Sequence, residues 1–167
     1  MTAQNGEGGS IGTGFQTARG RDWPSVRQFN VFVANRVGGL MRVVRWFEMT
    51  DIRIVSIMVV DSADCAIIRL VLSDPERAIG IFEQAHLPYT ESDLLVVKLP
   101  DHSQPILHIC KALLEAEVNI HYAYPLLVGP SGYASLALHV DDHEAAVNTL
   151  RAKGHVIYSE KDLNQEE

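Results

Sequence analysis

The sequence predicts an α+β protein made of two consecutive βαββαβ units. Apolar residues alternate along several short segments, they recur at helical spacing along others, and the whole order of segments occurs twice. This order gives an antiparallel sheet with both helices on one face, the ferredoxin-like arrangement. We therefore expect a first unit over residues 28–93 and a second over residues 94–163. Residues 1–27 hold six of the twelve glycines and no apolar periodicity, so we expect a flexible N-terminal tail there and a C-terminal tail over residues 164–167.

The first unit starts with a strand and an amphipathic helix. Apolar residues alternate from Phe29 to Val33, and they recur at helical spacing from Leu40 to Phe47. A hairpin of two β-branched strands follows, and the next helix begins with a capping residue and a proline. The expected elements are strands at residues 29–34, 52–60 and 66–72, helices at 40–48 and 75–85, and an extended segment at 89–92.

The second unit repeats this layout. Asn35, at the first turn, has its counterpart Asp101 66 positions later, and Asp74 corresponds to Asp142 68 positions later. The second hairpin is therefore two residues longer, and a period of this length indicates a domain duplication. Almost no linker separates the units, so we expect their sheets to lie side by side in one packed body. The expected elements are strands at residues 94–99, 119–128, 133–140 and 156–159, and helices at 106–117 and 142–153.

Composition excludes several classes of protein. The chain has 167 residues, of which 47% are hydrophobic, and its formal net charge is −7. This charge argues against nucleic acid or an anionic membrane as the main partner, since both require clustered Lys and Arg. No apolar run is long enough for a membrane span or a signal peptide, so we expect a cytoplasmic protein. Cys65 and Cys110 have no CxxC spacing and are expected to be reduced.

No sequence motif predicts catalysis. The chain lacks a P-loop, a dinucleotide-binding glycine fingerprint and a nucleophile elbow, so we expect neither an enzyme nor a cofactor. His102, His108 and His121, with Asp101 nearby, raise the alternative of a metal site. Their spacing matches no known metal motif, and hydrogen-bonded or solvated histidines explain them equally well, so no metal is assigned.

The turn after the first strand is the main candidate site. The strand ends at Asn35, and Gly38 and Gly39 open a helix, which brings unpaired backbone N–H groups to the surface. In the functional interpretation, the N–H groups of Gly38, Gly39 and Leu40 hold a carboxylate, and Asn35 contacts an ammonium group. In the alternative interpretation, the glycines only let helix and sheet pack closely.

Three short motifs carry a resemblance to a known family. Asn35, Gly38 and Leu40 form an N-x-x-G-x-L pattern, a later strand contains Tyr122-Ala123-Tyr124, and the chain closes with an S-E-x-x-L pattern over residues 159–163. Together with the duplicated order, they resemble the ACT domain twice in tandem, over residues 29–163. ACT domains are regulatory modules that bind amino acids or other small ligands between copies. The resemblance implies binding of a free amino acid, no catalysis and a homodimer.

The same resemblance implies where the ligand would bind. In the second loop the glycine of the family is replaced by Gln104, followed by Pro105, so we expect the first loop to bind more strongly. Two alternatives remain: a structural or dimerisation module that acts on a partner enzyme, and a metal-binding histidine site. The implied ligand-binding residues are Asn35, Arg36, Gly38, Gly39, Leu40, Ile54, Val55, Ser56 and Ile57 in the first unit, and Asp101, His102, Gln104, Ile106, Ile120, His121, Tyr122 and Ala123 in the second.

Overall fold

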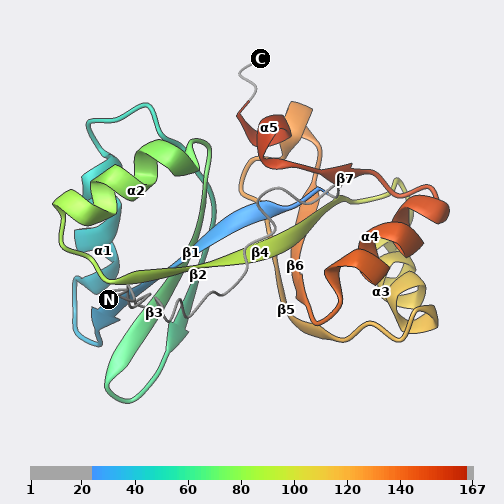
Figure 1. Cartoon of the computed structure of the whole chain (residues 1–167), viewed down its shortest axis with the longest axis horizontal. Coiled ribbons are helices and arrows are strands. Elements are labelled where there is room, and N and C mark those ends of the chain that lie inside the picture. Colours follow the sequence, from blue (N-terminus) through green and yellow to red (C-terminus); the bar gives the residue numbers. More distant parts are fainter. Residues whose placement is uncertain (1–23, 165–167) are drawn as a thin grey trace, which may run out of the picture.

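A computed structural model describes residues 24–164, and it has the predicted α+β fold (Figure 1). The first unit contains β1 (Val26–Ala34), α1 (Gly39–Val44), a 3₁₀ turn η1 (Arg45–Phe47), β2 (Ile54–Asp61), β3 (Cys65–Leu72), α2 (Pro75–Gln84) and the first half of β4 (Tyr89–Lys98). The second unit contains the second half of β4, α3 (Pro105–Glu115), β5 (Ile120–Pro125), a 3₁₀ turn η2 (Pro130–Gly132), β6 (Ser135–Val140), α4 (His143–Ala152), β7 (Ile157–Tyr158) and α5 (Glu160–Leu163).

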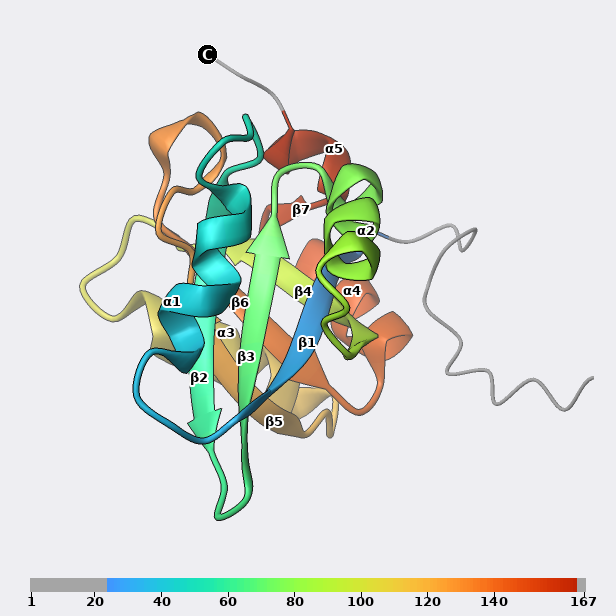
Figure 2. The same cartoon turned by 90° about the vertical axis from the view of Figure 1, so that its left-hand side faces the viewer.

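Each unit packs its two helices on one face of its strands. In the first unit, Phe29 of β1 lies under the helices, with its ring 5.0 Å from that of Phe82 in α2. Figure 2 shows α1 and α2 in front of the strands of this unit. In the second unit, Leu95 of β4 packs against Ile109 of α3 and Leu150 of α4. The alternating residues of the sequence therefore face the helices, as their period requires.

Asp74 and Asp142 cap the second helix of each unit. The Asp74 side chain accepts a hydrogen bond from the Arg77 N–H at 3.1 Å, and Asp142 accepts one from the Ala145 N–H at 2.9 Å. These bonds satisfy N–H groups that have no partner inside the helix. The two capping positions that mark the duplication in the sequence have the same structural role in both units.

Strand β4 belongs to both units. Its first half pairs with β1, with Leu94 opposite Val26, and its second half pairs with β6, with Leu95 opposite Leu138. The strands follow the order β2-β3-β1-β4-β6-β5, and β7 also pairs with β4. The predicted boundary between residues 93 and 94 thus falls inside one continuous strand.

The helix-free faces of the two units also pack against each other. Val26, Val55 and Val71 of the first unit share a buried cluster with Val96 and Tyr124 of the second. Figure 1 shows the consequence, with α1 and α2 at one end of the molecule and α3 and α4 at the other. The predicted side-by-side arrangement is therefore incomplete, because the sheets join at β4 and also face each other.

Hydrogen bonds connect β2 to the end of β5 across this interface. The Leu127 N–H donates to the Val55 carbonyl at 2.8 Å, and the Ser56 hydroxyl donates to the Pro125 carbonyl at 2.5 Å. The pairing of β2 with β3 shifts between Ile54 and Ser56, which is a β-bulge. The bulge is the reason that Val55 and Ser56, although adjacent, are both buried.

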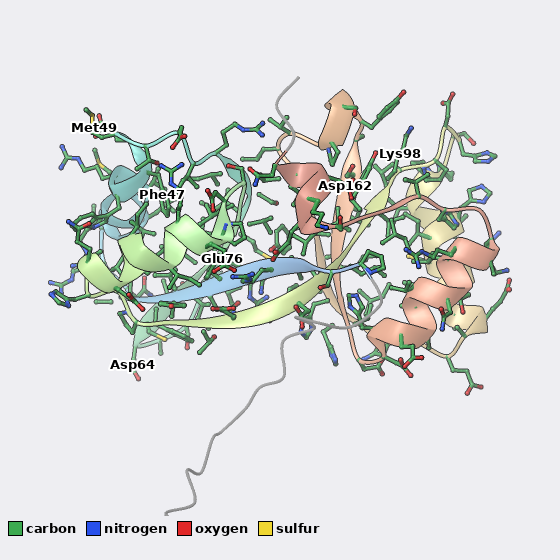
Figure 3. All side chains as sticks on the ribbon, turned by 45° about the horizontal axis from the view of Figure 1, so that its top comes forward. Phe47, Met49, Asp64, Glu76, Lys98 and Asp162 are labelled. Carbon is green, nitrogen blue, oxygen red and sulfur yellow. The ribbon has the colours of Figure 1, made fainter. Side chains whose placement is uncertain are left out.

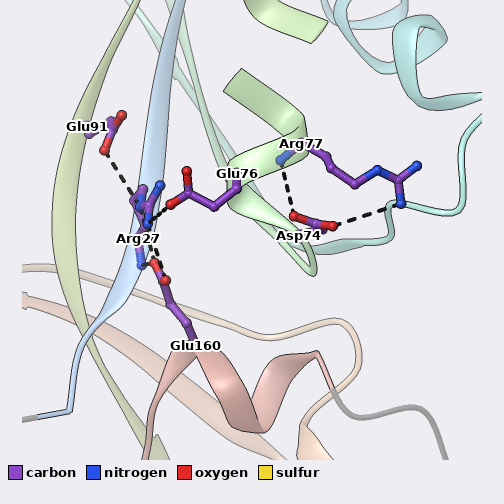
Figure 4. A network of polar contacts seen from close by, with 6 residues as sticks. All are labelled: Arg27, Asp74, Glu76, Arg77, Glu91 and Glu160. Carbon is purple, nitrogen blue, oxygen red and sulfur yellow. Dashed lines mark hydrogen bonds and ion pairs between the residues drawn. The ribbon is translucent and has the colours of Figure 1, made fainter. Parts of the chain in front are cut away.

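A buried arginine connects four elements of the chain (Figure 4). Arg27 of β1 is only 5% exposed, and its guanidinium lies 2.9 Å from a Glu76 oxygen of α2, 3.6 Å from Glu91 of β4 and 3.2 Å from Glu160 of α5. The Arg27 backbone N–H also donates to Glu160 at 3.1 Å. Helix α5 is thereby held against the first unit by charge-assisted hydrogen bonds.

Several predicted boundaries were wrong. Helix α1 ends at Val44 and continues as a 3₁₀ turn, β5 ends at Pro125 instead of residue 128, and α5 was not expected. Strand β1 begins at Val26, inside the predicted tail, whereas residues 1–23 and 165–167 of the two predicted tails lie outside the described residues.

No helix among residues 24–164 is long and apolar enough to cross a membrane. Cys65 and Cys110 are free and half-buried.

Candidate functional site

Hydrogen bonds already occupy part of the first loop. Gly38 has a φ of +85° and is the N-cap of α1. The Asn35 amide N–H₂ donates to an Asp61 carboxylate oxygen at 2.6 Å and to the Ser62 carbonyl at 3.1 Å, so this side chain holds the tip of the β2–β3 hairpin. The Gly39 N–H donates to the Arg36 carbonyl at 3.1 Å. Two of the groups predicted to contact a ligand therefore have partners within the chain.

The strand predicted to face a ligand loop contributes to the interface between the units. The Val55 carbonyl and the Ser56 hydroxyl are bonded to residues that follow β5, whereas Ile54 and Ile57 pack against the core of the first unit. Ile54 also lines an open groove of about 510 Å³ beside α1. The groove is lined by Met41, Val44, Arg45, Phe47, Glu48, Ile52 and Ile54.

A larger open groove lies at the second loop. It has a volume of about 690 Å³ and contains two opposite charges, those of Lys98 and Asp101. Figure 3 labels Lys98 in the second unit. The groove is lined by Lys98, Leu99, Pro100, Asp101, Pro105, Tyr133, Ala134, Gly154, His155 and Val156.

Three separate segments of the chain build this groove. The end of β4 is bonded to both of the others: the Lys98 N–H donates to the Val156 carbonyl at 2.9 Å, and the Leu99 N–H donates to the Ala134 carbonyl at 2.8 Å. The Lys98 ammonium lies 3.1 Å from the centroid of the Tyr133 ring, a cation–π contact. Backbone hydrogen bonds therefore fix the walls of the groove relative to one another.

Helix α3 begins at the rim of the groove. Its first residue is Pro105, which lines the groove and has no N–H, and the side chain of its N-cap residue Gln104 makes no capping bond. The positive end of the helix dipole is consequently not neutralised by a cap. The N-terminus of α3 therefore favours a negatively charged group of a ligand. It lies at the second loop, which was predicted from the sequence to bind more weakly than the first.

The three histidines considered as a metal site lie in two separate groups. His102 and His108 stack with ring centroids 4.3 Å apart, and burial, followed by the nearby His108 and Lys153, lowers the pKa of His155. His121 instead lies 5.3 Å from His139. Among residues 24–164, no group of three or more His, Cys, Asp or Glu side chains is arranged to hold a metal ion.

The remaining predicted residues of the second unit lie on β5 or at the start of α3. The Tyr122 ring stacks on His139 at 4.8 Å, and the Arg69 guanidinium lies 3.8 Å from the Tyr122 centroid. Ile106 is half exposed on α3. His102, Gln104, Ile106, Ile120, His121, Tyr122 and Ala123 do not line the 690 Å³ groove.

Of the ten residues that line the groove, sequence reasoning selected only Asp101, and Lys98, Tyr133, His155 and Val156 are among those that it missed. The turn at Gly154, whose φ is +81°, gives a local signal for a loop after α4. No local signal shows that this loop meets the end of β4, because the contact depends on the pairing of β4 with β6 and β7.

Comparison with known proteins finds one matching family model and several solved structures of similar fold. A family model described as an ACT domain pair matches residues 24–166. A crystal structure of a protein from Bacteroides thetaiotaomicron has a TM-score of 0.76 and 20% identity, over 85% of this chain and 97% of that chain. The regulatory subunit of aspartate kinase from Thermus thermophilus, in a ligand-free form, has a TM-score of 0.53 and 12% identity, over 78% of this chain and 93% of that chain. No curated protein matches the chain in sequence.

Proposed function

Because the chain belongs to the family of ACT domain pairs, we propose that it is a regulatory module that binds a free amino acid and catalyses no reaction. The family resemblance found in the sequence is thereby confirmed. One observation supports a binding role most directly: the 690 Å³ groove contains both a cation and an anion next to an uncapped helix. The regulatory role of the Thermus subunit is in line with this proposal.

The groove suits the chemistry of an amino acid. An amino acid carries a carboxylate and an ammonium group, so the Lys98 ammonium and the positive end of α3 offer contacts to the first and the Asp101 carboxylate to the second. Pro100, Pro105 and Val156 provide apolar walls for a side chain. Binding at the first loop, which the sequence favours, stays a prediction.

Calorimetric titration with each of the twenty amino acids tests the proposal. We expect binding of at least one, with an increase in melting temperature. Lys98→Met and Asp101→Asn should each weaken binding by about 1–3 kcal/mol, because each removes a charged hydrogen-bonding partner. Lys111→Met, on the exposed side of α3, is the matched control. If no amino acid binds the folded protein, the proposal is wrong.

Variants of the first loop distinguish the two candidate sites. If the ligand binds there instead, Gly38→Val abolishes binding, Asn35→Ala weakens it, and Lys98→Met leaves it unchanged. The homodimer and the cytoplasmic location expected from the sequence belong to the same proposal. Light scattering coupled to size-exclusion chromatography measures the mass of the chain in solution and tests the dimer.

A further inference from the structure

Several large apolar side chains of residues 37–49 are exposed to solvent. Five of them have relative exposures of 40% or more, and that of Met49 is 93%. Figure 3 shows Met49 pointing away from the first unit, whereas Phe47 lies within it. The exposed residues are Val37, Leu40, Met41, Trp46 and Met49, and we refer to them together with the groove beside α1 as the α1 surface.

The groove makes the α1 surface concave. Its volume is about 510 Å³, and apolar side chains of α1, η1 and the start of β2 form most of its lining. Exposed apolar patches of this kind mark interaction sites, and Met and Trp are enriched at the centres of protein interfaces. Phe47 and Ile52 are buried beneath, so the floor of the groove belongs to the core of the unit.

Three arginines lie in or next to this segment, and one of them, Arg45, lines the groove together with Glu48. Arg36, Arg42 and Arg45 are exposed, and none of them forms an ion pair with a carboxylate in the described part of the chain. This arrangement is unusual in a protein with 21 acidic and 14 basic residues. The neighbouring Arg77, by contrast, lies 2.6 Å from an Asp51 oxygen. Residues 36–49 thus contain three arginines and one acidic residue, Glu48, which gives this segment a formal charge of +2.

We propose that the α1 surface binds an amphipathic helix of a partner protein that carries acidic residues beside its apolar face. A helix presents apolar residues at positions i, i+3, i+4 and i+7, which suits an elongated apolar groove. Acidic residues at the edges of that helix would pair with Arg42 and Arg45. This role is independent of amino-acid binding at the second loop, which lies in the other unit.

Charge and shape argue against other occupants. In a symmetric contact between two copies, each surface meets itself, so α1 packed on α1 would bring Arg42 and Arg45 close to the same residues of the second copy. A membrane surface is broad and would not enter the concave groove. A separate acidic helix fits both the shape and the charge.

A library of displayed helical peptides tests the proposal on the full chain. Each peptide carries leucines at i, i+3, i+4 and i+7, and its flanking positions are randomised among Glu, Ser and Lys. We expect selection to enrich Glu at the flanks. The anisotropy of a labelled selected peptide should then show at least tenfold weaker binding to the double variant Arg42→Glu/Arg45→Glu. A second selection on that variant should enrich Lys.

Lys111→Glu, which places the same charge change on the exposed side of α3, is the control and should leave peptide binding unchanged. Far-UV circular dichroism checks that each variant is folded. The proposal is overturned if no peptide is enriched, if Lys is enriched on the unaltered protein, or if Arg42→Glu/Arg45→Glu binds the selected peptide equally well. It is also overturned if the protein is a dimer that Met41→Glu converts to a monomer, or if phosphatidylserine vesicles bind through Arg42 and Arg45.

Discussion

At the scale of single residues, the buried Arg27 connects several elements through its ion pairs. It is 5% exposed and contacts three carboxylates, of which the one on Glu76 is 70% exposed. We expect Arg27→Met to destabilise the protein by roughly 3 kcal/mol, since its loss leaves Glu91 and Glu160 without their buried cation. Glu76→Gln should cost less than about 1 kcal/mol, because an exposed ion pair contributes little. Urea unfolding measures both changes, and equal effects would contradict this account.

His139 makes the stability of the protein depend on pH. Burial lowers its pKa from the ordinary value of 6.5, and His121 and Arg69 lower it further. A histidine with a lowered pKa in the folded state takes up its proton more readily when the chain unfolds. Its contribution to stability is therefore fully present above pH 6.5 and is lost as the pH falls below that value.

We accordingly expect the melting temperature to fall between pH 7.5 and 5.5, and His139→Gln to reduce this dependence. The informative quantity is the slope against pH, because the loss of the stacked ring lowers stability at every pH. His155, whose pKa is also lowered, acts in the same direction, so a residual slope should persist. A slope that is unchanged in His139→Gln would refute the role of His139.

At the scale of elements, the turn between β5 and β6 leaves no room for a side chain at Gly129. A Cβ added to Gly129 would lie 1.7 Å from the Tyr133 carbonyl oxygen, so the loop could not keep its path. We expect Gly129→Ala to cost about 3 kcal/mol or more. Gly80→Ala in α2, where a Cβ would meet nothing within 4 Å, should instead stabilise the protein by about 0.5–1 kcal/mol. Thermal unfolding of the two variants compares them directly, and a stable Gly129→Ala protein would contradict the prediction.

The elements themselves were largely predictable, because period and capping are local properties. The alternation from Phe29 to Val33 and the capping residues Asp74 and Asp142 are each visible within a few positions of the sequence. The continuity of β4 was not visible. The sequence predicts an extended segment at residues 89–92 and a separate strand at 94–99, because Thr90 to Asp93 are all polar, whereas pairing with β1 and β6 makes both part of one strand.

The candidate site was less predictable, because its residues meet only through tertiary pairing. Asp101 was selected from its place in the duplicated turn. Lys98 and His155, which complete the groove, are far apart in the sequence and meet because β4 pairs with β7. The hydrogen bond from Asn35 to Asp61 could not be predicted either, because the sequence does not show that the β2–β3 hairpin lies beside the first loop.

At the scale of the whole molecule, a third core holds the two units together. It contains Val26, Val55 and Val71 from the first unit and Val96 and Tyr124 from the second, and it lies apart from the two cores beneath the helices. Gln28, which is fully buried, joins this core by accepting a 2.5 Å hydrogen bond from the Tyr124 hydroxyl. The interface therefore has both apolar packing and a buried amide that is hydrogen-bonded across it.

We therefore expect the first unit to be unable to fold alone. A chain of residues 24–93 would lose the part of β4 beyond Asp93 and would expose Val55 and Val71, and a unit of this size is only marginally stable even when its core is complete. Circular dichroism and urea unfolding of this fragment should show no cooperative transition. The full chain should unfold in one transition, because the third core and Arg27 couple its two units. A fragment that folds as a cooperative monomer, or a full chain with two separate transitions, would show that the interface contributes little to the stability of either unit.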